Sequence, residues 1–269
     1  MNKLQRERSL ANRINAFFPS TRFFPVWRRH FLVWRKTALA SLVGNLGEPI
    51  LYLLGMGYGL GRFVGTLEQL PYLLYVASGI LAVSSMNTAT FESLYGAFTR
   101  MTRQNTFLAM LTTPLQVADI VAGEVVWAAT KALFAGMAIF IVGSFLEAFP
   151  AKTALLALPV VFLSGLAFSS LAMVVTAVAP SYEFFLYYFT LVTTPMFLFC
   201  GVFFPVDSLP SWVQFLVTLL PLTHVIHLIR PLTTGLPLET PGLHLIILII
   251  YIMGGFGLAV HLIKKRLLI

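Results

Sequence analysis

The chain has 269 residues, of which 58% are hydrophobic and only 10% are charged, and its mean hydropathy is +0.86. A soluble domain of this length needs more charge to cover its surface, so the composition indicates a membrane protein. The net charge of +8 does not point to nucleic acid, because the cations gather in a few segments instead of forming one binding face.

Six apolar stretches are near the roughly 20 residues that a helix needs to cross the hydrocarbon core. We expect membrane-spanning helices at about 38–60, 71–92, 117–146, 153–178, 184–203 and 243–263. Fourteen of the 18 Lys and Arg residues lie in 1–36, 100–103 and 264–266, and only three fall on the opposite side of these spans. By the positive-inside rule, this is a multi-pass protein of the bacterial inner (plasma) membrane with both termini in the cytoplasm.

Residues 1–36 are expected to form a cytoplasmic tail and an amphipathic helix ahead of the membrane domain, 37–269. In the stretch "RFFPVWRRHFLVWRK", Trp27, Phe31 and Trp34 share one helical face, and the Arg and Lys residues occupy another. This pattern predicts a helix in the membrane interface, with its aromatic anchors among the headgroups and its cations near anionic lipid. A basic linker without a defined helix is the alternative.

Five glycines lie in the eleven residues "GMGYGLGRFVG", from Gly55 to Gly65. The spacing fails the G-x-G-x-x-G dinucleotide pattern from every start, and the chain contains no G-x-x-x-x-G-K-[ST] sequence. It contains G-x-x-x-G three times, at 55/59, 57/61 and 61/65. That motif predicts close packing against another span or a second copy of the chain.

A polar interval, "YGAFTRMTRQNTFLAMLTTPLQVADIVAGE", separates the second and third spans. Residues from Arg100 to Leu111 are expected to form a short helix that Pro114 ends. Met101, Leu108 and Leu111 would share one side, with Arg100, Arg103 and Gln104 more exposed. This helix offers a contact surface to a soluble partner, or it is an ordinary loop helix.

Ionisable side chains inside apolar spans are costly and therefore indicate function. The candidates selected on this ground are Glu48 in the first predicted span and Glu124 and Lys131 in the third. The last two share a helical face but lie about 10.5 Å apart along the axis, too far for a direct pair without another group between them. They either line a polar cavity or gate, or they are satisfied through neighbouring groups and by snorkelling.

Aromatic residues gather at the start of the fifth span and include Tyr187 and Tyr188. They form either an interfacial belt or a lining for sugar rings or acyl chains.

The stretch between the fifth and sixth spans holds two apolar pieces, Trp212–Leu220 and Leu222–Ile229, each too short to cross. We expect two short re-entrant helices at the outer face, and we find no catalytic triad, carboxylate pair or metal cluster in the sequence.

The strings "EPILYLLGMGYGLG", "LTTPLQVADIVAGEVVWAATKA" and "PMFLFCGVFFPVDSLPSWVQFLVTLLPLTHVIHLIRPL" resemble the ABC-2 type exporter permeases, and within them the NodJ-type branch of nodulation-factor (lipooligosaccharide) exporters. The resemblance covers nearly the whole chain beyond its N-terminal tail. It implies a homodimer docked on two separate cytoplasmic ATPase subunits, which bind the ATP and Mg, so this chain needs no cofactor of its own.

The same resemblance implies that the helix after the second span, roughly Arg100–Thr113, is a coupling helix. Arg103, Phe107 and Leu108 would lie at the ATPase contact, with Arg100 and Leu111 in the same helix. The conduit would form at the dimer interface from spans one, two and five, which makes Gly55, Gly59 and the region of Tyr187 candidate interface residues.

We therefore expect an all-α polytopic membrane protein with six spans, an N-terminal interfacial helix, a cytoplasmic coupling helix and an outer re-entrant hairpin. It would be a transporter subunit and not an enzyme, exporting a lipooligosaccharide, glycolipid or similar amphipathic substrate. Efflux of a drug or other small hydrophobic molecule is the nearest alternative. A polytopic membrane enzyme is a further one, but it would need convergent acid/base or metal groups, and the ten carboxylates are scattered.

Overall fold

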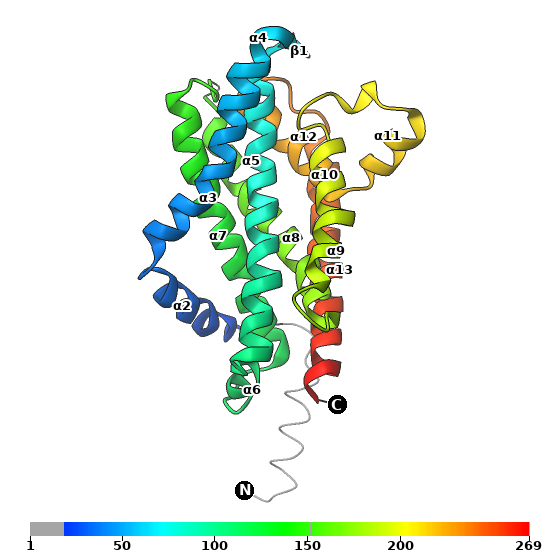
Figure 1. Ribbon diagram of the computed structural model, residues 1–269. Coiled ribbons are helices and arrows are strands. Elements are labelled where there is room, and N and C mark those ends of the chain that lie inside the picture. The colour runs from blue at the N-terminus through cyan, green and yellow to red at the C-terminus, as the bar shows by residue number, and fades with distance from the viewer. Residues whose placement is uncertain (1–18, 151, 269) are drawn as a thin grey trace, which may run out of the picture.

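The computed structural model describes residues 19–150 and 152–268, apart from the side chains of residues 42, 45, 46, 48 and 268. The expectations for the tail up to residue 18 and for the carboxylate of Glu48 lie outside this described part. Most of the described chain is helical, and its long helices run side by side in one bundle (Figure 1).

The first half of the chain contains an oblique helix and three long helical segments. Its elements are α2 (Phe23–Trp34), α3 (Ala38–Tyr52), η1 (Leu53–Leu60), α4 (Gly61–Val64), β1 (Thr66–Leu67), β2 (Leu70–Pro71), α5 (Tyr72–Phe91), η2 (Glu92–Gly96), η3 (Thr99–Arg103), α6 (Thr106–Leu111) and α7 (Val117–Phe145). The turns η1, η2 and η3 have π-helical geometry and continue the helices that precede them.

The second half adds two long helices with a set of shorter ones between them. Its elements are η4 (Ala154–Leu156), α8 (Ala157–Val178), α9 (Phe184–Tyr188), η5 (Phe189–Thr193), α10 (Thr194–Phe199), η6 (Val206–Ser208), α11 (Ser211–Thr218), α12 (Pro221–Thr234) and α13 (Pro241–Leu268).

Four helices in the described part are long and apolar enough to cross a membrane: Tyr72–Arg103, Val117–Phe145, Ala154–Val178 and Pro241–Leu267. The pair α11 and α12, bent by 84°, would make up to five if counted as one span. The predicted span at 184–203 corresponds to a shorter apolar helix, Phe184–Phe199, and the predicted span at 38–60 lies in the helical run from α3 through α4. The arrangement with six spans stays a prediction.

Small side chains allow the central helices to approach closely. On α5, Ser85 lies 2.7 Å from Ser164 of α8, hydroxyl to hydroxyl. At the next position of α8, a Cβ at Gly165 would lie only 2.8 Å from the Cα of Ala129 on α7. Glycine and serine at helix contacts are typical of membrane bundles, where association depends on close packing and interhelical hydrogen bonds.

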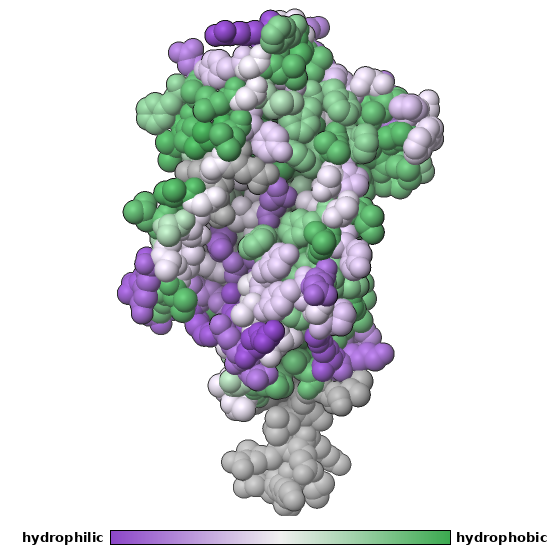
Figure 2. All heavy atoms as spheres, viewed as in Figure 1, coloured by the Kyte–Doolittle hydropathy of each residue, from purple (hydrophilic) through white to green (hydrophobic). Residues whose placement is uncertain are grey.

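The bundle has two distinct ends. At one end lie α2, α6 and the last turns of α13, and at the other lie α4, the β1–β2 hairpin and α11 (Figure 1). The hairpin pairs Thr66 with Pro71 and Leu67 with Leu70, and its two turn residues, Glu68 and Gln69, have positive φ. On the face shown in Figure 2, hydrophilic residues gather over α2 and the lower part of the bundle.

The prediction of one short helix from Arg100 to Leu111 is wrong. Residues 100–103 are instead the last turn of the long helix that begins at Tyr72, and only Thr106–Leu111 form the separate helix α6. The chain reverses at Asn105, which adopts the left-handed conformation with φ of 52°. Asn tolerates this conformation better than most residues, so the break lies there.

The two short apolar helices predicted before the last long helix are confirmed as α11 and α12. The second of them, α12, is held against the bundle by the buried side chain of Arg230. Its guanidinium stacks 3.6 Å above the ring of Tyr75, and it donates hydrogen bonds to the Ser78 hydroxyl and the Gly201 carbonyl. One side chain thereby ties α12 to α5 and to the turn after α10.

Candidate functional site

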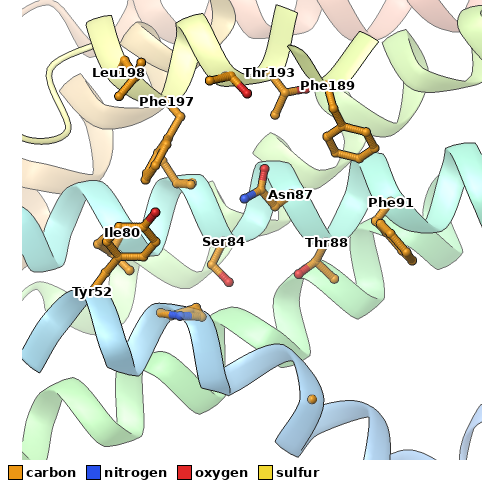
Figure 3. A pocket seen from close by; sticks show the side chains of 14 residues that line it. Tyr52, Ile80, Ser84, Asn87, Thr88, Phe91, Phe189, Thr193, Phe197 and Leu198 are labelled. Atoms are coloured by element: carbon orange, nitrogen blue, oxygen red, sulfur yellow. The ribbon is translucent and has the colours of Figure 1, made fainter. Parts of the chain in front are cut away.

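A cavity of about 600 Å³ opens between α3, the middle of α5 and the broken helix α9–η5–α10 (Figure 3). Its lining comes from three parts of the chain that are distant in sequence. The lining residues are Gly44, Pro49, Tyr52, Ile80, Val83, Ser84, Asn87, Thr88, Phe91, Phe189, Thr193, Thr194, Phe197 and Leu198.

The polar part of this cavity comes mainly from one face of α5. Ser84, Asn87 and Thr88 follow helical spacing, which places their side chains close together. Figure 3 shows Asn87 turned toward the α10 segment and the two hydroxyl residues turned toward α3. The Oδ1 atom of Asn87 is buried and has no hydrogen-bond partner among the described residues. A buried carbonyl without a partner is costly, so this position favours a water or a ligand that donates a hydrogen bond.

Aromatic rings form the apolar part of the same cavity. Tyr52 of α3 meets Phe197 of α10 edge to face, with 5.3 Å between ring centroids. Toward the other end, Phe91 and Phe189 lie 6.4 Å apart with their planes tilted by 49°. Rings beside an amide and several hydroxyls can hold a molecule with apolar faces and hydroxyl groups.

The aromatic and glycine residues selected from the sequence lie on the same helices but do not line this cavity. Tyr187 is 63% exposed, and Tyr188 is partly buried on another side of its helix. Gly55 and Gly59 are exposed, and a Cβ at Gly55 would meet nothing within 4 Å. The residue that does reach the cavity from the aromatic cluster is Phe189.

The glycine motifs of the first long helix have two different environments. A Cβ at Gly57 would lie 2.5 Å from Leu73 Cδ1, and one at Gly61 would lie 3.6 Å from the ring of Tyr72. Both neighbours belong to α5, so this motif packs inside the chain. Gly55 and Gly59 present an uncovered strip of backbone.

Glu124 and Lys131 belong to one buried ion network. Lys131 Nζ lies 2.8 Å from Glu92 Oε2, and Glu92 Oε1 accepts a hydrogen bond of 2.9 Å from Arg100. Arg100 also donates to both oxygens of Glu124, at 2.6 to 3.1 Å, and His30 Nε2 lies 3.1 Å from Glu124 Oε1. The expected intervening group exists, and it consists of Glu92 and Arg100.

This network joins three elements: α2 through His30, the end of α5 through Glu92 and Arg100, and α7 through Glu124 and Lys131. Arg100 was expected on the exposed side of a coupling helix, but its side chain is only 15% exposed. The two carboxylates hold it inside, because an unpaired charge would be costly there.

The short helix α6 presents a mixed surface at the α2 end of the bundle. Arg103, just before it, and Leu108 are exposed, and Leu111 is half-buried. Phe107 is completely buried in an apolar cluster with residues such as Phe98 and Ile120. Among the candidate contact residues, Arg103 and Leu108 are therefore available to a partner at the surface, and Phe107 anchors the helix from below.

The amphipathic helix α2 forms where it was predicted, but its aromatic face contacts protein. Trp27 Nε1 donates to Thr130 Oγ1 at 3.0 Å, and the Trp34 ring stacks on Phe134 at 4.8 Å. Phe31 lies between the two indoles. A Cβ at Gly123 would lie 2.5 Å from Val26, so this glycine allows α2 to lie directly on α7.

The sequence patterns did not point to several residues of these sites. Glu92 lies at the last position of a predicted span, where a charge costs less than at mid-span, so the rule that selected Glu124 gives a weaker signal there. His30 and Asn87 gave no such signal, because a single histidine or asparagine on a helix is common. The contact between His224 and His244, 2.8 Å between Nδ1 atoms, joins α12 to α13 across a distance that local spacing does not show.

Comparison with known proteins gives three findings. The model of the ABC-2 type transporter family matches residues 21–233. Nodulation protein J of Rhizobium leguminosarum bv. viciae is 49% identical over 90% of this chain and 94% of its own length, and that of Rhizobium meliloti (strain 1021) is 47% identical over 90% and 93%. The inner membrane transport permease YadH of Escherichia coli (strain K12) is 21% identical over 75% and 78%.

The family match covers most of the chain and includes every lining residue of the cavity between α3, α5 and α10. The strong similarity to the two nodulation proteins extends over almost the full length of both chains. The chain belongs to the ABC-2 type transporter family and is a membrane permease of that family.

Proposed function

We propose that this permease is the membrane subunit of an ATP-driven exporter that moves a lipooligosaccharide or similar glycolipid outward across the bacterial inner membrane. The observation that carries this proposal is the cavity between α3, α5 and α10, which combines aromatic rings with several hydroxyls and an amide oxygen that has no partner among the described residues. Sugar hydroxyls match the amide and hydroxyl groups, and the ring faces or an acyl chain match the aromatic residues.

In this proposal, ATP and Mg bind to two separate ATPase subunits, which dock at the α6 end. The exposed side chains of Arg103 and Leu108 supply a cation and an apolar contact there. The permease itself needs only to bind its substrate differently in two conformations, because a ligand shifts a conformational equilibrium by its differential affinity. Both termini would lie on the same cytoplasmic side.

A second copy of the chain completes the transporter in this proposal. The uncovered strip at Gly55 and Gly59 lies on the same helix as Tyr52, which lines the cavity. Close packing of two such strips would bring two cavities toward one shared passage. The surrounding lipids cover the remaining exposed apolar surface.

The experiment is ATPase stimulation by lipooligosaccharide in the reconstituted complex, comparing Asn87→Ala with Thr190→Ala. Thr190 is exposed, one residue from the lining Phe189, and is not itself part of the lining. Loss of one hydrogen bond is worth about 1 kcal/mol, so Asn87→Ala should raise the half-stimulating concentration about fivefold. Thr190→Ala should leave it unchanged.

The same assay separates this proposal from efflux of small hydrophobic molecules, which the four aromatic residues of the lining also suit. Stimulation by apolar drugs that is insensitive to Asn87→Ala, with no response to lipooligosaccharide, would support drug efflux and contradict glycolipid export.

A further inference from the structure

A second, smaller cavity of about 250 Å³ lies beneath the bend between α2 and α3, at the α6 end of the bundle. We call it the elbow cavity. It is separate from the cavity between α3, α5 and α10, with which it shares no lining residue. Arg29 and Trp34 of α2 form one side of it, and Glu92, Arg100 and Lys131 form the other.

The polar groups around the elbow cavity have hydrogen-bond donors to spare. Glu92, the lining carboxylate, is already satisfied: it accepts from Trp127 Nε1 at 3.1 Å, from Arg100 at 2.9 Å and from Lys131 at 2.8 Å. Trp34 Nε1 is buried and has no partner among the described residues. An indole N–H can only donate, so its complement is a ligand with acceptor atoms.

The net charge around the elbow cavity is positive and also favours a ligand with acceptor atoms. Arg100 and Lys131 are balanced by Glu92 and Glu124, two against two. Arg29 is exposed at the cavity, and no carboxylate in the described part of the chain lies within ion-pair distance of it. One unmatched cation, an unused indole N–H and the remaining ammonium hydrogens of Lys131 are the groups that bind a phosphate oxygen well.

We propose that the elbow cavity binds the phosphate headgroup of an anionic membrane phospholipid. The apolar surface beside the cavity favours a lipid over a soluble phosphate. Val33 lines the cavity and is 64% exposed, and Leu39 and Val43 of α3, which follow the lining residue Thr37 in the chain, are 78% and 62% exposed. A lipid whose phosphate lies beneath the bend can place an acyl chain along these three residues. A soluble anion would leave them exposed.

A lipid bound in the elbow cavity would affect the structure around it. The elbow cavity is bounded by α2, by the last turns of the helix that leads into α6, and by α7. A bound phosphate would therefore contact the same three elements that the ion network joins, and would stabilise their arrangement when the membrane contains anionic lipid.

The test measures lipid binding by native mass spectrometry, using full-length protein released from nanodiscs of phosphatidylcholine with and without phosphatidylglycerol. Trp34→Phe keeps an aromatic ring against Phe134 but removes the N–H donor. Arg29→Gln removes the unmatched charge. The matched control is Arg28→Gln, an exposed cation on the same helix that does not line the cavity.

The wild-type chain should retain phosphatidylglycerol in preference to phosphatidylcholine. Each cavity variant should weaken that retention about fivefold, which is roughly the effect of losing one charge or one hydrogen bond near the membrane surface. The control Arg28→Gln should weaken it by less than twofold. Equal losses for Arg28→Gln and Arg29→Gln would show general attraction to a basic helix and overturn the site. Displacement of the lipid by inorganic phosphate or glycerol phosphate at similar concentration would assign the cavity to a soluble anion and overturn the lipid. Neither readout depends on transport.

Discussion

At the scale of single residues, the clearest feature is a balanced ion network inside an apolar bundle. Two carboxylates and two cations alternate in the order Lys131, Glu92, Arg100 and Glu124, with His30 beyond the last. Burying any one of these charges alone would cost several kcal/mol, so each depends on its neighbours. The network therefore fixes the position of the helix end that leads into α6.

We predict that Glu92→Gln destabilises the chain. This change leaves Lys131 without its carboxylate partner and Arg100 with Glu124 alone, so that one positive charge is in excess. We expect the free energy of unfolding to fall by about 3–5 kcal/mol, the usual cost of removing one partner from a buried pair. Denaturant unfolding of the purified chain measures it.

A second variant tests whether charge balance is the cause. Glu92→Gln combined with Lys131→Met leaves one cation, Arg100, paired with one carboxylate, Glu124. This double variant should recover most of the lost stability. Glu183→Gln, at an exposed carboxylate, serves as the control and should change little. Failure of the double variant to recover would show that the shape of Glu92, and not its charge, is what matters.

The sequence predicted part of this network and missed the rest for a physical reason. Glu124 and Lys131 were selected because a charge within an apolar helix is costly. Glu92 lay at a predicted helix end, and Arg100 in a predicted polar segment, where charges cost little. Only the continuation of the helix to Arg103 brings both inside the bundle.

At the scale of elements, the helix from Ala38 to Val64 gives a matched pair of glycines. A Cβ at position 57 would lie 2.5 Å from Leu73 Cδ1 of α5, so a leucine there must displace Leu73, whereas a Cβ at position 55 would meet nothing within 4 Å. We predict that Gly57→Leu lowers the free energy of unfolding by about 1–3 kcal/mol, the cost of overpacking. Gly55→Leu should leave it within about 0.5 kcal/mol.

Cross-linking of copies in membranes separates the roles of these two positions. If Gly55 lies between two copies, Gly55→Leu should reduce cross-linking while the chain remains folded. Unchanged cross-linking would remove this strip from the interface between copies.

The short helix α6 allows a similar comparison between two neighbouring residues. Leu108 is 45% exposed and Phe107 is fully buried. We predict that Leu108→Glu abolishes co-purification of the ATPase with little change in stability, and that Phe107→Ala costs about 3–5 kcal/mol of folding free energy. Retention of the ATPase by a folded Leu108→Glu variant would exclude this face of α6 as the contact.

The elements themselves were predicted well where the signal was a long apolar run, and less well at their ends. The helices at 117–146, 153–178 and 243–263 correspond closely to α7, η4–α8 and α13. The reversal at Asn105 and the hairpin at Glu68 and Gln69 depend on single backbone conformations, which composition does not reveal. The aromatic face of α2 was correct as a pattern, but its contact with α7 depends on Gly123, far away in sequence.

At the scale of the whole molecule, the features described above lie toward opposite ends of an apolar bundle. The ion network, the elbow cavity and α6 gather toward one end, and the hairpin, α11 and the start of α12 lie toward the other (Figure 1). The proposed substrate cavity lies between them, along the middle of α5. This order is what a permease needs if a motor acts at one end and a substrate leaves at the other.

The most direct test of that order is accessibility labelling of single cysteines in intact cells with a maleimide that does not cross the inner membrane. Cys200 is buried, so the parent chain gives a low background. Cysteines would replace Thr112, exposed just after α6, and Gln69, exposed in the hairpin at the other end. We predict that Gln69→Cys is labelled from outside, and that Thr112→Cys is labelled only after the inner membrane is permeabilised. Labelling of Thr112→Cys from outside would contradict it, because a cytoplasmic ATPase could not then reach α6.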